Sequence, residues 1–284
     1  MSRFFRHLVA SRAGLFGATF VALFLITALA APIMAPHDPL KMDLKKRLAP
    51  PTMSLSGPGD FPLGADQIGR DILSRIITGS RVTLLVAATA VLLGATIGVS
   101  LGLVAGYFGG WNERIIMRIA DIQLSIPLLL FALIVIAVLG PSLVNLVIVL
   151  ALTGWTRFAR ITRGEVLSLR EQEFVLSARG AGAGRARILF RHILPNVLTA
   201  AIVVATLELA RVVVLESALS FLGLGVQPPH ASWGRMLADG RGYISSGWWL
   251  STFPGVAIVL VVLGVNLLGD WMRDYFDPKM SGSR

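Results

Sequence analysis

The chain has 284 residues, of which 55% are hydrophobic and 15% charged, and it carries a formal net charge of +10. This composition leaves too little polar surface for a water-soluble globular protein and indicates a membrane protein. The absence of cysteine excludes disulfide bonds, thiolate metal sites and cysteine nucleophiles. The positive charge lies in loops that border apolar segments, so we expect no nucleic-acid partner.

Four nearly uncharged runs are long enough to cross a membrane as helices, because about 20 helical residues cross a hydrocarbon core of roughly 30 Å. Division of one run and a further span after residue 195 give six predicted membrane helices. In chain order they are predicted at about 13–35, 82–108, 119–139, 143–157, 196–221 and 250–270. The uncharged run 122–156 is too long for one span, and Gly140-Pro141-Ser142 divides it into a helical hairpin. The sequence therefore predicts an all-α, polytopic membrane protein.

The first apolar segment allows two interpretations. Arg3, Arg6 and Arg12 precede it, and Ala28-Leu29-Ala30 near its end is typical of a secretory signal peptide that is cleaved. We favour a retained membrane helix. Cleavage would leave the orientation of the other five helices unchanged.

The distribution of Lys and Arg predicts the orientation, because positive charge accumulates on the cytosolic side. With the amino terminus in the cytosol, segments 1–12, 109–118, 157–195 and 270–284 hold 16 of the 26 Lys and Arg residues, and outer loops 36–80 and 223–249 hold 8. A Lys45-Lys46-Arg47 cluster in the first outer loop runs against this bias. We predict that both termini are cytoplasmic.

The loop 157–195 is the most informative segment, with eight arginines and three glutamates. We predict a helix over 161–179, a glycine turn at 180–184, a second helix over 185–193, and Pro195 at the junction with the next membrane helix. Small residues at the turn would allow close entry into a groove, and arginines suit acidic or polar rims of a partner protein or anionic lipid headgroups. No G-x-x-x-x-G-K-[ST] motif occurs, so we expect another polypeptide to bind nucleotide.

Charged residues inside the fifth predicted helix require an explanation, because ionisable groups are costly in hydrocarbon. Glu208 and Arg211 are spaced to pair on one helix face, and Glu216 extends that face. One interpretation is an internal salt bridge, and the other is a solute pathway. Asp121 and Gln123 are either a polar interior pair or residues of the cytosolic interface.

The outer loops offer a second contact surface. Asp66, Arg70 and Asp71 precede an amphipathic stretch, 72–78, that we expect to lie along the membrane face. Trp233, Trp248 and Trp249 are typical of aromatic anchors at the membrane interface. We hypothesise that both outer loops together receive a partner. His192 is interpreted as a surface or docking residue, because the four histidines are scattered and predict no metal site.

Four stretches carry a resemblance to a known family. Leu176-Ser177-Ala178, Gly182, His192 and Leu194-Pro195 occupy the spacing of the pattern E-A-A, three residues, G, nine residues, I, one residue, L-P, with the glutamate and the isoleucine replaced. The stretches 62–81, 216–237 and 253–278 match further. In these features the chain resembles the inner-membrane permease subunits of binding-protein-dependent ABC importers, specifically the peptide and nickel class.

This resemblance implies the type I ABC importer permease fold with six transmembrane helices, in the bacterial inner membrane. It implies three parts: 1–80 with the cytosolic arm, first helix and outer loop; 81–272, the core with a coupling loop at 157–195; and 273–284, a cytosolic tail. Implied partners are a second homologous permease, one or two ABC ATPase subunits, an extracytoplasmic substrate-binding protein and membrane lipids. ATP and Mg would be used by the ATPases, and this chain would bind no cofactor and be no enzyme.

The implied cargo is a dipeptide or oligopeptide, with nickel chelates, glutathione or another small solute as alternatives, and a membrane receptor with a basic docking loop as a remote one. Candidate residues of the ATPase-coupling loop are Leu176, Ser177, Ala178, Arg179, Gly180, Ala181, Gly182, Ala183, Arg187, Arg191, His192 and Pro195. Candidates for the translocation path are Glu208, Arg211 and Glu216, and candidates for binding-protein contact are Asp66, Arg70, Asp71 and Trp233.

Overall fold

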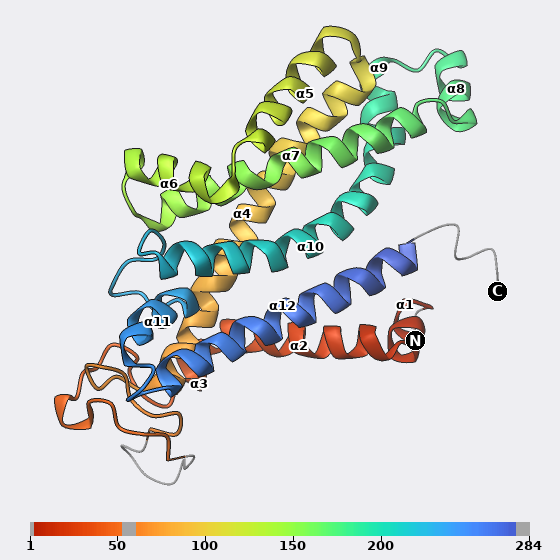
Figure 1. Ribbon diagram of the computed structural model, residues 1–284. Helices are drawn as coiled ribbons and strands as arrows, with labels where there is room; N and C mark the ends of the chain where they lie inside the picture. Colours follow the sequence, from red (N-terminus) through yellow and green to blue (C-terminus); the bar gives the residue numbers. More distant parts are fainter. Residues whose placement is uncertain (1–2, 53–60, 277–284) are drawn as a thin grey trace.

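The computed structural model describes residues 3–52 and 61–276, apart from the side chains of residues 3–6. Within these ranges the chain is helical and contains no strand (Figure 1). The elements are α1 (Arg3–Ala10), α2 (Arg12–Leu29), α3 (Ala31–Met34), η1 (Leu44–Lys46), α4 (Ile72–Phe108), α5 (Gly110–Ser125), α6 (Leu128–Leu139), α7 (Leu143–Leu169), α8 (Glu173–Gly180), α9 (Arg185–Arg187), η2 (Ile188–Ile193), α10 (Leu194–Phe221), α11 (Trp233–Gly240), η3 (Arg241–Tyr243) and α12 (Trp249–Phe276).

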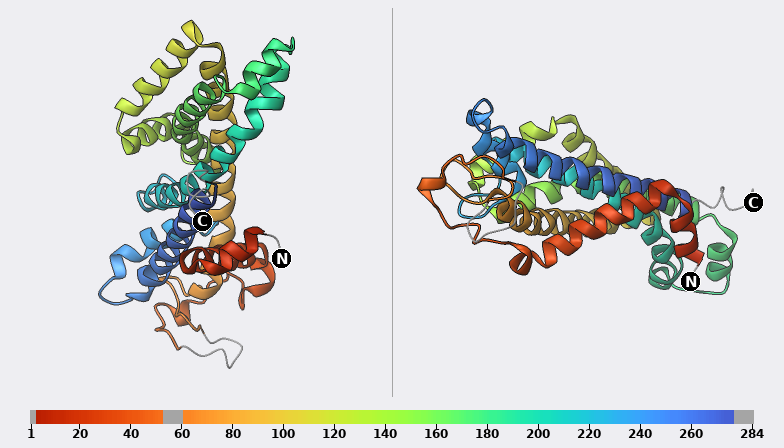
Figure 2. Two further views of the ribbon diagram at one scale, coloured as in Figure 1. Left: turned by 90° about the vertical axis from the view of Figure 1, so that its right-hand side faces the viewer. Right: turned by 90° about the horizontal axis from the view of Figure 1, so that it is seen from below.

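Five helical segments in the described ranges are long and apolar enough to cross a membrane: α2, α4, α7, the continuous segment Arg185–Phe221 and α12. The pair α5 and α6 makes a sixth span if its two arms, bent by 94°, are counted together. The loops that hold α3, η1 and α11 gather at one end of the bundle (Figures 1 and 2). At the opposite end lie α1, α8 and the last turns of α12.

The helices α4 and α7 pack along a row of glycines. Gly94, Gly98, Gly102 and Gly106 recur every four residues on α4, and each faces the backbone or a Cβ atom of α7. A Cβ atom placed at Gly102 would lie 2.6 Å from the Ala159 carbonyl oxygen. Small residues at this spacing let two helix backbones approach closely, which maximises van der Waals contact where lipid supplies no hydrophobic drive. The row therefore sets the spacing of the two helices.

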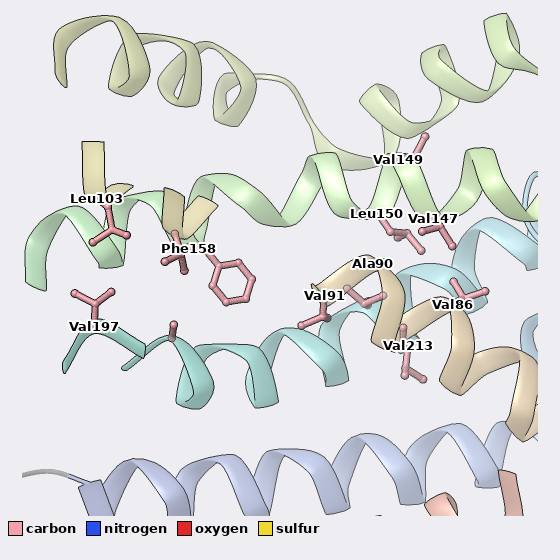
Figure 3. Packing of buried hydrophobic residues seen from close by; sticks show 14 of the residues in the cluster. Val86, Ala90, Val91, Leu103, Val147, Val149, Leu150, Phe158, Val197 and Val213 are labelled. Carbon is pink, nitrogen blue, oxygen red and sulfur yellow. The ribbon is translucent and has the colours of Figure 1, made fainter. Parts of the chain in front are cut away.

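Apolar side chains fill the space where α4, α7 and α10 converge, beside the glycine row. Phe158 of α7 is 1% exposed, and Val213 of α10 is 0% exposed. Figure 3 shows these two residues in one cluster with Val86, Ala90, Val91, Leu103, Val147, Val149, Leu150 and Val197. Tight packing of this kind holds α10 against the α4–α7 pair.

The helix α2 is packed against α12 by a second set of small residues. A Cβ atom at Gly17 would lie 2.5 Å from the backbone nitrogen of Leu268, and one at Gly14 would meet the Trp271 ring at 2.6 Å. On the α12 side, Gly264 faces the Cβ atom of Phe20. The first apolar segment thus lies in close contact with the last membrane helix.

The prediction of one straight helix over 119–139 is wrong. A helix, α5, begins already at Gly110, ends at Ser125, and is followed after a sharp bend by α6. Pro127 lies in the bend, where it has no N–H to donate to a continuing helix. The segment 109–118, expected as a loop, is therefore largely helical.

Two other boundaries also differ from the expectation. The stretch 72–78 does not lie separately along the membrane face, because it forms the first two turns of α4. The expected boundary between residues 80 and 81 consequently falls inside one continuous helix. The break at 140–142 is confirmed: Gly140 has φ of +81°, and the Ser142 hydroxyl accepts the backbone N–H of Asn145 at the start of α7.

Candidate functional site

The tip of the polar loop is a helix, α8, that ends in a tight glycine turn. Gly182 has φ of +79°. The N–H of Ala183 donates to the carbonyl of Ala178, and the N–H of Gly182 donates to the carbonyl of Arg179, each at 3.0 Å. These two bonds and the left-handed residue form a Schellman motif, the arrangement that ends a helix where glycine is present. The predicted glycine turn is confirmed.

The predicted helix over 161–179 is interrupted. The helix α7 continues from the membrane to Leu169, and three residues separate it from α8. On the far side of the turn, α9 and η2 lead without a break into α10. The helix α8 and its glycine turn thus lie between two membrane helices, α7 and α10, in the chain (Figure 1).

A small apolar core anchors the tip and leaves its outer face open. Val175 of α8 is 0% exposed and belongs to the same core cluster as Ile188 and Ile193 of η2. Phe174 and Phe190, in contrast, are 41% and 63% exposed. These two side chains are available for contact with another molecule.

The predicted coupling-loop residues are accessible in this chain. Exposed members are Leu176, Ser177, Arg179, Gly180, Ala181, Gly182, Arg187, Arg191 and Pro195. Ala178, Ala183 and His192 are half-buried. The His192 ring lies 6.4 Å from the Phe174 ring, between centroids. We call these residues the loop tip.

The eight arginines of the loop divide into two groups. Four interact within the chain: Arg157 with Glu208, Arg160 with Asp121, Arg163 with Glu113, and Arg170 with Glu171 and the Gly106 carbonyl. The other four lie exposed around the loop tip and have no ion-pair partner among the described residues: Arg179, Arg185, Arg187 and Arg191. Only half of the arginines therefore remain for a partner.

Glu208 is the centre of a three-residue charge cluster. Its side chain is 3% exposed, and its carboxylate contacts the guanidinium of Arg211 at 3.0 Å and that of Arg157 at 2.9 Å. The pairing of Glu208 with Arg211 on one helix was predicted, and it is confirmed. The contribution of Arg157 was missed, because we assigned this residue to the loop, whereas it lies on α7 and its exposed side chain reaches Glu208 of α10.

Glu216 does not join this cluster. Its residue is fully buried, and the Ser220 hydroxyl donates to its carboxylate at 2.7 Å. The Ser220 oxygen in turn accepts the N–H of Val226, at 3.1 Å. Ser232, the N-cap residue of α11, lies 3.5 Å from the Ser220 oxygen. Glu216 thus connects the end of α10 to the outer segment that follows it.

The four predicted binding-protein contacts lie inside the protein. Asp66, Arg70, Asp71 and Trp233 are 3%, 9%, 1% and 3% exposed. Direct contact through these side chains in this conformation is therefore a wrong prediction. Asp66 binds Arg70 at 2.6 Å, and Arg70 and Arg75 both contact Asp239 of α11. This network joins the first outer loop to α4 and α11.

Asp71 and two tryptophans also have structural roles. Asp71 is the N-cap of α4, accepts the N–H of Ser74 at 3.0 Å, and contacts the ring of His37 at 3.2 Å. The indole N–H groups of Trp233 and Trp249 donate to backbone carbonyls, so their role as membrane anchors is not supported. Trp248, at 51% exposed, fits that role.

Asp121 and Gln123 of α5 both interact with α7 and do not pair with each other. Asp121 binds Arg160, and Gln123 accepts the indole N–H of Trp155 at 2.7 Å. In the described ranges, no three His, Cys, Asp or Glu side chains gather in the manner of a metal site.

Comparison with known proteins identifies the family. A family model described as "Binding-protein-dependent transport system inner membrane component" matches residues 98–282. A second, "N-terminal TM domain of oligopeptide transport permease C", matches residues 1–51. The di/tripeptide transport system permease protein DppC of Pseudomonas aeruginosa is 40% identical over 283 residues, which cover 100% of this chain and 93% of that protein.

A further relative and a solved structure agree with this match. The dipeptide transport system permease protein DppC of Alkalihalophilus pseudofirmus is 41% identical over 97% of this chain and 89% of that protein. A chain of the MetNI methionine ABC transporter, in an inward-facing conformation, superposes with a TM-score of 0.58 at 20% identity, covering 72% of this chain and 98% of that chain. The fold is that of a type I ABC importer permease. The chain belongs to the family of inner-membrane components of binding-protein-dependent transport systems.

Proposed function

We propose that this permease forms half of the membrane pathway of an ABC importer for dipeptides or oligopeptides, and that its loop tip couples the pathway to ATPase subunits. The observation that carries the proposal is the exposed loop tip, which lies between α7 and α10 in the chain, at one end of the bundle (Figure 1). Relatives named for dipeptide transport support the cargo.

Coupling follows from how the loop tip is built. Exposed arginines suit a polar or acidic rim on an ATPase, and Phe174 and Leu176 suit an apolar groove. Because Val175 is anchored against η2, a displacement of α8 is passed to α10. Movement of two ATPase subunits would thereby bias the helices between two arrangements of the bundle.

The chemistry of ATP is assigned to the partners. ATP and Mg²⁺ would be bound by one or two kinds of ATPase subunit, and this chain would bind no cofactor and catalyse no reaction. A second homologous permease would complete the pathway, to which Arg211 would contribute directly, while the buried Glu208 and Glu216 would contribute by holding neighbouring residues in place. Nickel chelates, glutathione and other small solutes remain the alternative cargo, with a membrane receptor as the remote alternative.

The outer end would receive an extracytoplasmic substrate-binding protein. The buried network around Asp66 and Asp71 would fix the positions of the first outer loop, α4 and α11, whose exposed parts form the docking surface. A cleft of about 330 Å³ lies over it, lined by residues that include His37, Asp38 and Lys41. Exposed charges of both signs around the cleft suit a polar docking surface.

The sidedness of the chain follows from the same assignment. The loop tip, α1 and the end of α12 lie at one end of the bundle, which would place both termini in the cytoplasm (Figures 1 and 2). The close contact of Gly17 with α12 supports α2 as a permanent membrane span.

Reconstitution tests the proposal. The chain is co-expressed with the second permease and the ATPases, the complex is placed in proteoliposomes, and the cognate binding protein is added with radiolabelled L-alanyl-L-alanine. We expect ATP-dependent uptake that requires the binding protein. Mass spectrometry of the solute that co-purifies with the binding protein checks the cargo independently. Uptake that proceeds without ATPase subunits would contradict the coupling.

A further inference from the structure

The charge cluster around Glu208 lies at the middle of α10. Glu208 is 14 residues after Leu194 and 13 before Phe221, the ends of that helix. At 1.5 Å per residue it is therefore about 20 Å from either end, which corresponds to the centre of a bilayer. Charges at this depth are costly unless they are paired or face a watery cavity.

The cluster has one positive charge more than it can pair. Along α7, Arg160 and Arg163 each have a carboxylate of α5 as partner. Arg157 and Arg211 must instead share Glu208, and the structure gives neither guanidinium a second acid within 4.0 Å among the described residues. The cluster is left with a formal charge of +1.

The unused donors remain accessible. The side chains of Arg157 and Arg211 are 52% and 25% exposed, whereas that of Glu208 is 3% exposed. Gly154, one turn before Arg157, faces Glu208 without a side chain: a Cβ atom there would lie 4.0 Å from Oε2. Each guanidinium has five N–H donors and contributes one nitrogen to Glu208, so donors remain for another acceptor.

We propose that Arg157 and Arg211 bind the free carboxylate of the passing solute, and that Glu208 holds the two guanidiniums in place. A planar guanidinium matches a carboxylate with two parallel hydrogen bonds, and a second arginine balances the solute's charge. The inference rests on the proposed function and adds to it a chemical class: solutes with a free carboxylate, such as the carboxyl terminus of a peptide.

The test compares two cargoes in proteoliposomes that contain the complete importer: L-alanyl-L-alanine and its carboxyl-terminal amide, each at a concentration that saturates the binding protein. We expect Arg211→Gln to lower uptake of the acid by about tenfold or more, and uptake of the amide by less than about twofold. Arg157→Gln should act in the same direction. Arg160→Gln, which removes the same charge from α7 outside the cluster, should keep the wild-type ratio of acid to amide.

Other outcomes separate the possible errors. If Arg211→Gln slows both cargoes equally while the second permease still co-purifies, Arg211 does not distinguish the free carboxylate, and the proposal is overturned. Wild-type uptake of both cargoes by Arg211→Gln and Arg157→Gln also overturns it. If the unmodified importer transports neither cargo, the proposed function itself fails and this inference falls with it. Should Arg211→Gln not assemble, Arg157→Gln carries the comparison.

A second measurement needs no binding protein. Val214 is 46% exposed and lies one turn beyond Arg211. In Val214→Cys the new residue would be the sole cysteine of this chain. We compare the rate at which this cysteine reacts with an anionic thiosulfonate to its rate with a cationic one. This ratio of rates should be about fivefold higher in Val214→Cys than in the Val214→Cys Arg211→Gln double variant. No reaction with either charged reagent would place this face in lipid and overturn the proposal.

Discussion

The glycine row between α4 and α7 gives the sharpest stability prediction. A Cβ atom at Gly102 would lie 2.6 Å from the backbone oxygen of Ala159 and from the Cβ atom of Thr162, whereas ordinary contact begins at 3.4 Å. In Gly102→Ala the two helices must therefore separate by about 0.8 Å, the difference of these distances. Overpacking of this kind costs about 1–3 kcal/mol.

Gly164→Ala is the matched control. Gly164 lies in α7, and a Cβ atom there would meet nothing within 4 Å. Both substitutions gain about 0.8–1 kcal/mol of helix propensity, so the two variants differ by the overpacking cost alone. Thermal unfolding in detergent micelles, followed by circular dichroism, should show Gly102→Ala melting about 2–10 °C below Gly164→Ala. Equal melting temperatures would refute the close approach of α4 and α7.

Three further substitutions probe the loop tip and the outer end. Gly182→Ala forces alanine into a left-handed conformation at a cost of about 1–2 kcal/mol. Trypsin should therefore cleave the loop about 5–30 times faster than in the control Gly180→Ala, because Gly180 is helical and a Cβ atom there meets nothing within 4 Å. Equal cleavage rates would argue against the Schellman turn. Asp71→Ala removes the N-cap of α4 and should lower the free energy of unfolding by about 0.5–2 kcal/mol in urea titrations, while an unchanged midpoint would contradict the capping role. Glu216→Ala should increase the rate of hydrogen exchange at the Val226 amide, and Glu216→Gln should increase it less. Identical exchange rates in the two variants would show that the carboxylate does not hold the outer segment.

The membrane helices were predictable because hydrocarbon thickness sets a minimum length that the apolar runs meet. Pro127 was a sequence signal for the bend, because proline has no N–H to continue the hydrogen bonding of a helix. We did not use it, because it lies within a long uncharged run that we interpreted by its length. The four-residue spacing of Gly94 to Gly106 is a recognisable signal for close helix packing that we did not use. Both features could be read locally.

The roles of individual charges were much less predictable. Arg157 is 51 residues from Glu208 in the chain, and Arg75 is 164 residues from Asp239, so only the folded arrangement reveals these pairs. Asp66 and Arg70 were expected to contact a partner because they lie in an outer loop before an amphipathic stretch, and charged residues are mostly exposed. Tertiary pairing across the outer loops overrode that tendency. The glycine turn was predictable, since it depends on local backbone conformation.

In the proposed importer, the loop tip touches a separate ATPase at the inner surface of the membrane. Because the chain has no native cysteine, Ser177→Cys on α8 and Ser246→Cys at the opposite end each provide one thiol, and both positions are exposed. In membranes that contain the complete importer, a short heterobifunctional crosslinker that reacts with a thiol at one end and a lysine amine at the other should join the ATPase to Ser177→Cys and never to Ser246→Cys. Capture of the ATPase by Ser246→Cys, or its consistent absence from Ser177→Cys, would show that the ATPase does not bind at the loop tip.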